Sequence, residues 1–189
     1  MDNIALRDAR DGEAGVIVQM IREMVTDMAG YGGNAPATDN AAWEKIAGTV
    51  ADELRGARAK YVIAETGGRD AVGLGGAELI TLGGAFAPKK TLHITAIYVV
   101  PQFRRGGIGS ALLTRMLDWG QAVGSERCDL HVLTNNPAKS LYEKHDFSVL
   151  EVKMIRSFGT ECAPVDDTIP DQERWPVSRI GDIITPIVG

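Results

Sequence analysis

The sequence is poor in the residues that build disulfides and metal sites. Among its 189 residues are two cysteines, Cys128 and Cys162, and three histidines, His93, His131 and His145. Two cysteines this far apart give neither a CxxC pair nor a disulfide framework. The histidines follow no metal-ligand spacing. We therefore expect no metal site.

Long apolar runs and an excess of positive charge are also absent. No stretch approaches the roughly 20 consecutive apolar residues that a membrane-spanning helix needs. Residues 1–11 are charged and lack the apolar core of a secretory signal. The net charge of −5 argues against a general nucleic-acid binder. We expect a cytoplasmic protein with neither membrane nor nucleic-acid partners.

The clearest local pattern lies between residues 92 and 124. The β-branched and aromatic run Ile94–Val100 indicates a strand. Pro101 ends this strand, because proline has no N–H for a ladder hydrogen bond. After a short loop, apolar residues recur at the 3.6-residue spacing of a helix. They are Leu112, Leu113, Met116, Leu117 and Val123.

The loop between this strand and helix is rich in arginine and glycine. Glycine has no Cβ, so an anion can approach its backbone closely. Backbone N–H groups at the start of a helix carry partial positive charge and favour phosphate. The loop is neither a P-loop, since no lysine follows its glycines, nor a GxGxxG loop, since Leu112 takes the third position. It matches Q/R-x-x-G-x-G/A, as Arg104-x-x-Gly107-x-Gly109.

A second motif occupies residues 135–147, which read NNPAKSLYEKHDF. It is similar to N-x-x-A-x-x-[FLY]-Y-x-x-x-G-F, with Asn135 and Tyr142 at the two most distinctive positions. Asp146 replaces the usual glycine, and aspartate tolerates a left-handed backbone better than most residues. Through these two motifs the chain resembles the GNAT superfamily of acyl-CoA N-acyltransferases.

The resemblance implies an α/β fold with a mixed, mostly antiparallel sheet flanked by helices. It also implies a splay between the strand before the glycine loop and the next strand. Residues 1–158 would form the GNAT-like acetyltransferase domain. Residues 159–189 contain four prolines, which forbid a long helix. We expect them to form an extended C-terminal appendage packed on the same domain.

Periodicity and turn residues predict the other elements. Asp8 or Asp11 is expected to cap the first helix, and Thr38 or Asp39 the second. Three glycines inside one strand, 71–82, indicate a bulge or a close backbone approach. The remaining strands are expected at 4–8, 61–66, 127–133 and 149–158, and the remaining helices at 17–28, 43–54 and 138–145.

The resemblance implies acetyl-CoA as the co-substrate and assigns roles to particular residues. In the family the glycine loop holds the pyrophosphate, and the preceding strand pairs with the pantetheine arm. The Val99 N–H would polarise the thioester carbonyl, and Tyr142 would protonate the departing thiolate. A phenol, with a reference pKa of about 10, suits that role. The expected cofactor-binding residues are Ile97, Tyr98, Val99, Arg104, Arg105, Gly106, Gly107, Ile108, Gly109, Ser110 and Asn135.

The general base is left open by the sequence. Some relatives carry a glutamate near the positions of Thr95 and Ala96, and neither residue is acidic here. Glu78, His93, His131 or a chain of waters could take the proton instead.

The resemblance implies transfer of an acetyl group from acetyl-CoA to a primary amine of a small molecule. Direct attack in a ternary complex is expected, because no cysteine or serine has the setting of a nucleophile. One alternative is a protein N-terminal or lysine acetyltransferase. Another is a non-catalytic acyl-CoA-binding module, which the missing carboxylate near Thr95 keeps open. Relatives are often dimers, so a homodimer is a further expectation.

Overall fold

The computed structural model describes residues 3–82 and 89–156. In order along the chain, its elements are β1 (Ala5–Asp8), α1 (Ala14–Ala29), α2 (Asn40–Arg55), β2 (Ala59–Glu65), β3 (Ala71–Leu82), β4 (Lys89–Val99), the 3-10 turn η1 (Pro101–Phe103), α3 (Ile108–Ala122), β5 (Arg127–Leu130) and α4 (Lys139–Glu143). None of the helices within these ranges is long and apolar enough to cross a membrane.

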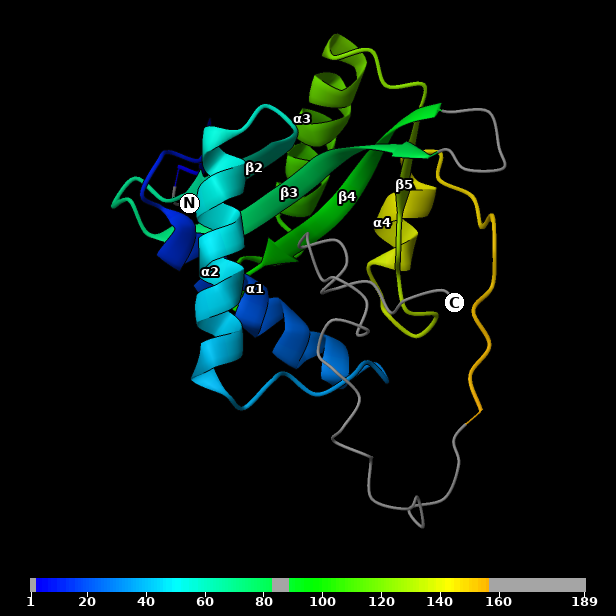
Figure 1. The fold of residues 1–189 in the computed structure, drawn as a ribbon, viewed down its shortest axis with the longest axis horizontal. Helices are drawn as coiled ribbons and strands as arrows, with labels where there is room; N and C mark the ends of the chain where they lie inside the picture. The colour runs from blue at the N-terminus through cyan, green and yellow to red at the C-terminus, as the bar shows by residue number, and fades with distance from the viewer. Residues whose placement is uncertain (1–2, 83–88, 157–189) are drawn as a thin grey trace, which may run out of the picture.

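The strands form one sheet in the order β1-β2-β3-β4-β5. Neighbouring strands are antiparallel except β4 and β5, which run parallel. Helices α1 and α2 cover one face of the sheet, and α3 crosses the other (Figure 1). The predicted mixed, mostly antiparallel α/β fold is therefore confirmed.

Two hydrophobic clusters hold the helices on the sheet. Adjacent strand residues point to opposite faces, so Tyr61 packs towards α1 and α2 while Val62 packs towards α3. Fully burying a large aliphatic side chain stabilises the fold by about 1.5–3 kcal/mol. The most buried side chains include Ile17 and Ile21 on α1, Val50 on α2, and Leu112, Leu113 and Met116 on α3.

The two predicted helix caps have different outcomes. Asp39 caps α2 as expected, since its carboxylate accepts a hydrogen bond of 2.9 Å from the Ala41 N–H. The prediction for α1 is wrong, because Glu13 occupies the N-cap position. Asp8 is instead part of β1, where its carboxylate pairs with Lys60 at 2.7 Å.

The chain after α3 departs most from the prediction. β5 ends at Leu130 rather than at residue 133, and α4 is shorter than expected. The predicted strand at 149–158 is wrong for residues 149–156, which form no strand. β-propensity alone does not make a strand without a ladder partner. The large apolar side chains of residues 149–156 are 68–90% exposed; they are Val149, Leu150, Val152, Met154 and Ile155. The appendage at 159–189 lies outside the described residues.

A bulge interrupts the pairing of β3 with β4, as the glycines of β3 predicted. Gly76 pairs with Ala96 and Ala77 pairs with Ile94, so Thr95 is left without a partner on β3. A Cβ on Gly76 would lie 2.8 Å from the Thr95 hydroxyl oxygen. The bulge therefore depends on this glycine, and it marks the point where β4 leaves β5.

Gly120 allows α3 to approach β4 closely. A Cβ at this position would lie 2.6 Å from the Cδ2 atom of Leu92, a fully buried side chain. We expect Gly120→Ala to lower the free energy of unfolding in urea by about 1–3 kcal/mol, the usual cost of overpacking a core. Gly48→Ala is the matched control, because a Cβ on Gly48 of α2 meets nothing within 4 Å. It should raise stability by about 0.5–1 kcal/mol, and equal effects of the two variants would contradict the packing account.

Candidate functional site

The last residues of β4 have an open edge. β5 pairs with β4 from Thr91 to Ile94 and ends there, whereas β4 continues to Val99. Residues 95–99 therefore lack a strand partner on the β5 side within the part of the chain that the structure describes. This confirms the predicted splay between the strand before the glycine loop and the next strand.

The open edge presents particular backbone groups. The Val100 N–H donates a hydrogen bond of 3.0 Å to the Val72 carbonyl on β3. Because successive residues of a strand point their backbone groups to opposite edges, the N–H groups of Val99 and Ile97 face away from β3. Those two residues were predicted to hold the thioester and pantetheine. Tyr98, between them, pairs with Leu74 of β3.

The loop after β4 leaves a row of backbone donors free. At one end of the loop, the Arg104 N–H donates to the Pro101 carbonyl and closes η1. At the other end, the Ala111 N–H donates to the Gly107 carbonyl at 3.0 Å. Among the described residues, no acceptor meets the consecutive N–H groups from Arg105 to Ser110. The last three belong to the first turn of α3, where the helix dipole adds positive potential. This row can bind an anion.

Backbone conformation turns the loop around this row. Gly107 has φ +84°, and Arg105 has φ +66°. Positive φ is unfavourable for residues with a Cβ, which accounts for a glycine at the N-cap of α3. A Cβ on Gly107 would meet no atom within 4 Å, so the surface beside this residue is open.

The two arginines of the motif have different surroundings. The Arg104 guanidinium pairs with Asp27 of α1, bonds to the Val99 carbonyl at 2.7 Å and lies over the Tyr98 ring. The Arg104 side chain therefore links β4 to α1, and its charge is not directed to the loop. The exposed Arg105 makes no ion pair within the described residues and leaves its charge available beside the free N–H groups.

Ser110 connects the loop to the segment after α4. Its hydroxyl oxygen lies 2.6 Å from Nε2 of His145. The sequence singled out Ser110 but gave His145 no role, because that position in the second motif is variable. The bond fixes the start of α3 against the turn that follows Tyr142.

Tyr142 is buried, with 9% of its surface exposed. Its ring meets the Phe147 ring edge-on, with centroids 6.0 Å apart. Burial raises the pKa of its hydroxyl to about 12, so the group is protonated at any working pH. Within the described residues the hydroxyl makes no hydrogen bond, which leaves it available as a donor.

The second motif places two neighbouring asparagines before α4. Asn135 is exposed and makes no hydrogen bond within the described chain, whereas the Asn136 side chain accepts one of 2.9 Å from the Ala138 N–H. The N-cap position of α4 is Ala138, so the Asn136 bond closes the turn just before the helix. Asp146 adopts φ +65°, so aspartate does take the left-handed conformation of the usual glycine. A role for Asn135 at the cofactor stays a prediction.

The three candidate bases from the sequence lie on one part of the sheet. Glu78 and His93 are direct partners across β3 and β4, and both are buried. His131 follows β5, and its ring centroid lies 5.4 Å from that of His93. The structure adds Asp129, which the sequence missed because its bond to His93 spans two strands.

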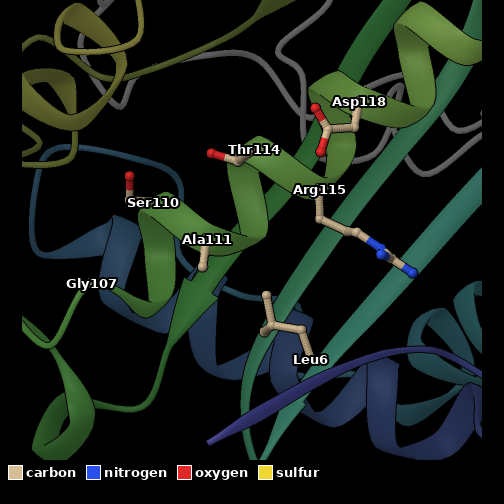
Figure 2. A pocket seen from close by; sticks show the side chains of 7 residues that line it. All are labelled: Leu6, Gly107, Ser110, Ala111, Thr114, Arg115 and Asp118. Carbon is tan, nitrogen blue, oxygen red and sulfur yellow. The ribbon is translucent and has the colours of Figure 1, made fainter.

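A hollow runs along the exposed side of α3 from the glycine loop. Figure 2 shows Ala111 and Leu6 pointing towards each other across it, and the Ser110 hydroxyl pointing away. No residue of β4 lines this hollow, so it extends the loop end of the site rather than the splay. Its lining residues are Leu6, Gly107, Ser110, Ala111, Thr114, Arg115 and Asp118.

The described cysteine does not have the setting of a nucleophile. Burial raises the pKa of the Cys128 thiol to about 12, and the nearby Asp129 charge adds to the shift. The thiolate reacts and the thiol does not. We therefore expect Cys128 to resist iodoacetamide at pH 8 in the folded protein and to react in urea, as measured by mass spectrometry of its peptide. Equal labelling in both states would contradict the thiol's protected setting.

Comparison with known proteins identifies the class to which this fold and loop belong. The sequence matches the Acetyltransferase (GNAT) family over residues 19–147. A predicted acetyltransferase from Clostridium acetobutylicum, solved with acetyl-CoA, superposes with a TM-score of 0.66 at 16% identity, covering 82% of this chain and 96% of that one. The fold is therefore that of an acetyltransferase.

Two further solved structures share the fold. An acetyltransferase from Trypanosoma brucei has a TM-score of 0.59 at 17% identity, covering 82% of this chain and 100% of that chain. Glucosamine-6-phosphate N-acetyltransferase from Arabidopsis thaliana has a TM-score of 0.57 at 14% identity, covering 84% and 100%. Because the family match spans more than half of the sequence, the chain belongs to the GNAT family of acetyltransferases.

Proposed function

We propose that this protein transfers an acetyl group from acetyl-CoA to a primary amine of a small molecule, by direct attack in a ternary complex. The observation that carries the proposal is the row of free N–H groups from Arg105 to Ser110, placed directly after an open strand edge. The row suits a diphosphate. The edge suits an extended, amide-rich arm, which can pair with it as an added strand would.

Each end of acetyl-CoA has a matching set of protein groups. The loop N–H groups would hold the diphosphate, and the Arg105 charge would add attraction. The pantetheine arm would pair with the backbone of Ile97 and Val99 along the open edge. The Val99 N–H would then donate to the thioester carbonyl oxygen, where negative charge develops during attack.

Tyr142 and Cys128 bear on the mechanism of acetyl transfer. The Tyr142 hydroxyl is protonated and unpaired within the described chain, so it can give its proton to the departing sulfur. A proton held at a pKa near 12 passes only to a strong base, and a thiolate shielded from water is one. The raised pKa of the Cys128 thiol disfavours a covalent acetyl-enzyme at this residue, which supports direct transfer.

A small-molecule acceptor is favoured over a protein acceptor on two grounds. The net charge of −5 favours a cationic amine. The fold also occurs in an enzyme named for acetylating a small amino sugar phosphate. Acetylation of a protein N-terminus or lysine is the second candidate, and a non-catalytic acyl-CoA-binding module is the third. Cytoplasmic location and a homodimer stay predictions.

The test combines binding with turnover. Titration calorimetry should show that acetyl-CoA binds, and release of the coenzyme A thiol should then be followed across small amines and peptides with free N-termini or lysines. Turnover with a small primary amine supports the proposal. Turnover with peptides alone would establish the second candidate, and binding without turnover on a thorough panel would establish the third.

A further inference from the structure

The segment that follows α4 has a row of large apolar side chains in contact with solvent. Five of them fall within seven residues and are 68–90% exposed; they are Val149, Leu150, Val152, Met154 and Ile155. The segment runs along the margin of the molecule, beyond β5 and α4 (Figure 1, orange). Contiguous exposed apolar side chains of this kind mark an interaction surface.

The side chains of this 149–155 segment are symmetric in chemistry about Val152. One step away on each side lies a charge, acidic at Glu151 and basic at Lys153. Two steps away on each side lies a long apolar side chain, and three steps away a β-branched one. These two pairs are Leu150 with Met154 and Val149 with Ile155. The segment is therefore complementary to an antiparallel copy of itself.

The two charges of the segment are not matched by β5 of the same chain. Glu151 and Lys153 form no ion pair within the residues that the structure describes. They lie near the end of β5, since both charges act on the pKa of His131, in opposite directions. Asp129, the acid of β5, already has partners on both carboxylate oxygens, at 2.7 and 2.9 Å. A second copy of the segment offers Lys153 an acid that is not already bonded.

We propose that the 149–155 segment is a dimerisation surface, on which two copies of this chain pair as antiparallel strands about Val152. In this register Val152 lies opposite itself, as a two-fold axis requires. Glu151 of each copy lies opposite Lys153 of the other. Opposite charges facing each other across two strands stabilise the pairing, and like charges destabilise it. The proposal does not depend on the proposed acetyl transfer.

The pairing also accounts for the apolar residues and for the missing strand. Alternation places Leu150, Val152 and Met154 of both copies on one face, where they shield one another from water. Seven residues at about 3.4 Å each span roughly 24 Å, which is an ordinary strand length. The segment has the composition of a strand and forms none in a single chain, because its ladder partner would be the second copy.

Sedimentation velocity of the full chain tests the oligomeric state. We expect the dimer to be the main species at about 100 µM, as for an interface below the standard size. Val152→Lys sets two like charges opposite each other at the two-fold axis, so the dimer should dissociate at least about 10-fold more readily. Circular dichroism should show an unchanged fold, because Val152 is exposed.

Val16→Lys is the matched control for this variant. It makes the same substitution at a valine that is also exposed, by 42%, but lies on α1. Its dimer should be as tight as that of the unmodified protein. A monomer at all concentrations would overturn the proposal; it would mean that β5 or residues 157–189 of the same chain cover the segment. Equal weakening by both variants would also overturn it.

Charge reversal tests the register. Glu151→Lys leaves the segment with two basic side chains, and Lys153→Glu leaves it with two acidic ones. Each variant alone should dimerise about 10-fold more weakly at low salt. An equimolar mixture of the two should form a mixed dimer as tight as the unmodified one, because each acid then faces a base. A mixture that associates no more tightly than either variant alone would contradict the register.

Cysteine cross-linking locates the two-fold axis in a Cys128→Ser/Cys162→Ser chain. Val152→Cys should form a disulfide with its own copy under mild oxidation, because Cα atoms directly opposite lie about 4.5–5.5 Å apart, within the reach of a disulfide. Leu150→Cys is the comparison, since the two copies of this residue would lie about 14 Å apart along the strands. Cross-linking of both variants to the same extent, or of neither, would overturn the proposal.

Discussion

Gly107→Val is expected to weaken acetyl-CoA binding at least about 100-fold, or about 2.7 kcal/mol, without unfolding the protein. Valine would place a Cβ beside the free N–H groups, where Gly107 leaves open space. Its branched side chain is also strained at φ +84°, so the loop would turn its donors away from a common centre. The dissociation constant is measured by titration calorimetry and the melting temperature by circular dichroism.

Gly124→Val is the matched control for strain. Gly124 follows the other end of α3, has φ +75° and also has nothing within 4 Å of a Cβ. Both variants should lose about 1–2 kcal/mol of stability to the left-handed backbone. Only Gly107→Val should lose affinity. Retained affinity in Gly107→Val would mean that the loop is not the anion site.

Tyr142→Phe is expected to lower kcat about 100-fold while leaving acetyl-CoA affinity within about twofold, because a general acid contributes mainly in the transition state. The fold should lose little, since the hydroxyl has no hydrogen-bond partner within the described chain and the ring contact with Phe147 remains. With a pKa of about 12, the hydroxyl is protonated below that pH. The unmodified enzyme should therefore show no loss of rate from this group up to about pH 11.

Tyr61→Phe provides the comparison for a buried tyrosine without a catalytic role. Its hydroxyl donates to the Glu53 carboxylate, and the residue is 4% exposed. Loss of this bond should cost about 1–3 kcal/mol of stability in urea and leave kcat unchanged. An unchanged kcat in Tyr142→Phe would remove the acid role, and equal losses in both variants would point to general disturbance.

Local patterns in the sequence predicted the parts of the site that depend on neighbouring residues. Pro101 ends β4, the glycines mark the loop that follows it, and the 3.6-residue apolar spacing predicted α3. Each of these signals acts within a few positions of the chain. The fold class was predicted for the same reason, together with the family resemblance.

Contacts between distant segments were beyond local reasoning. The Arg104 side chain is drawn to Asp27 of α1, and Asp129 meets His93 only because β5 pairs with β4 at that register. The end of β5 and the lack of a strand at residues 149–156 also depend on which strand offers a partner. Such outcomes are set by tertiary packing, which propensity does not encode.

The most direct test of the account is an amide NMR titration of the full chain with coenzyme A. The N–H signals from Arg105 to Ser110 should move most, together with those of Ile97 and Val99, and pantetheine lacking the diphosphate should move only the strand signals. The contradicting result is tight binding of coenzyme A that leaves the signals of Arg105 to Ser110 in place.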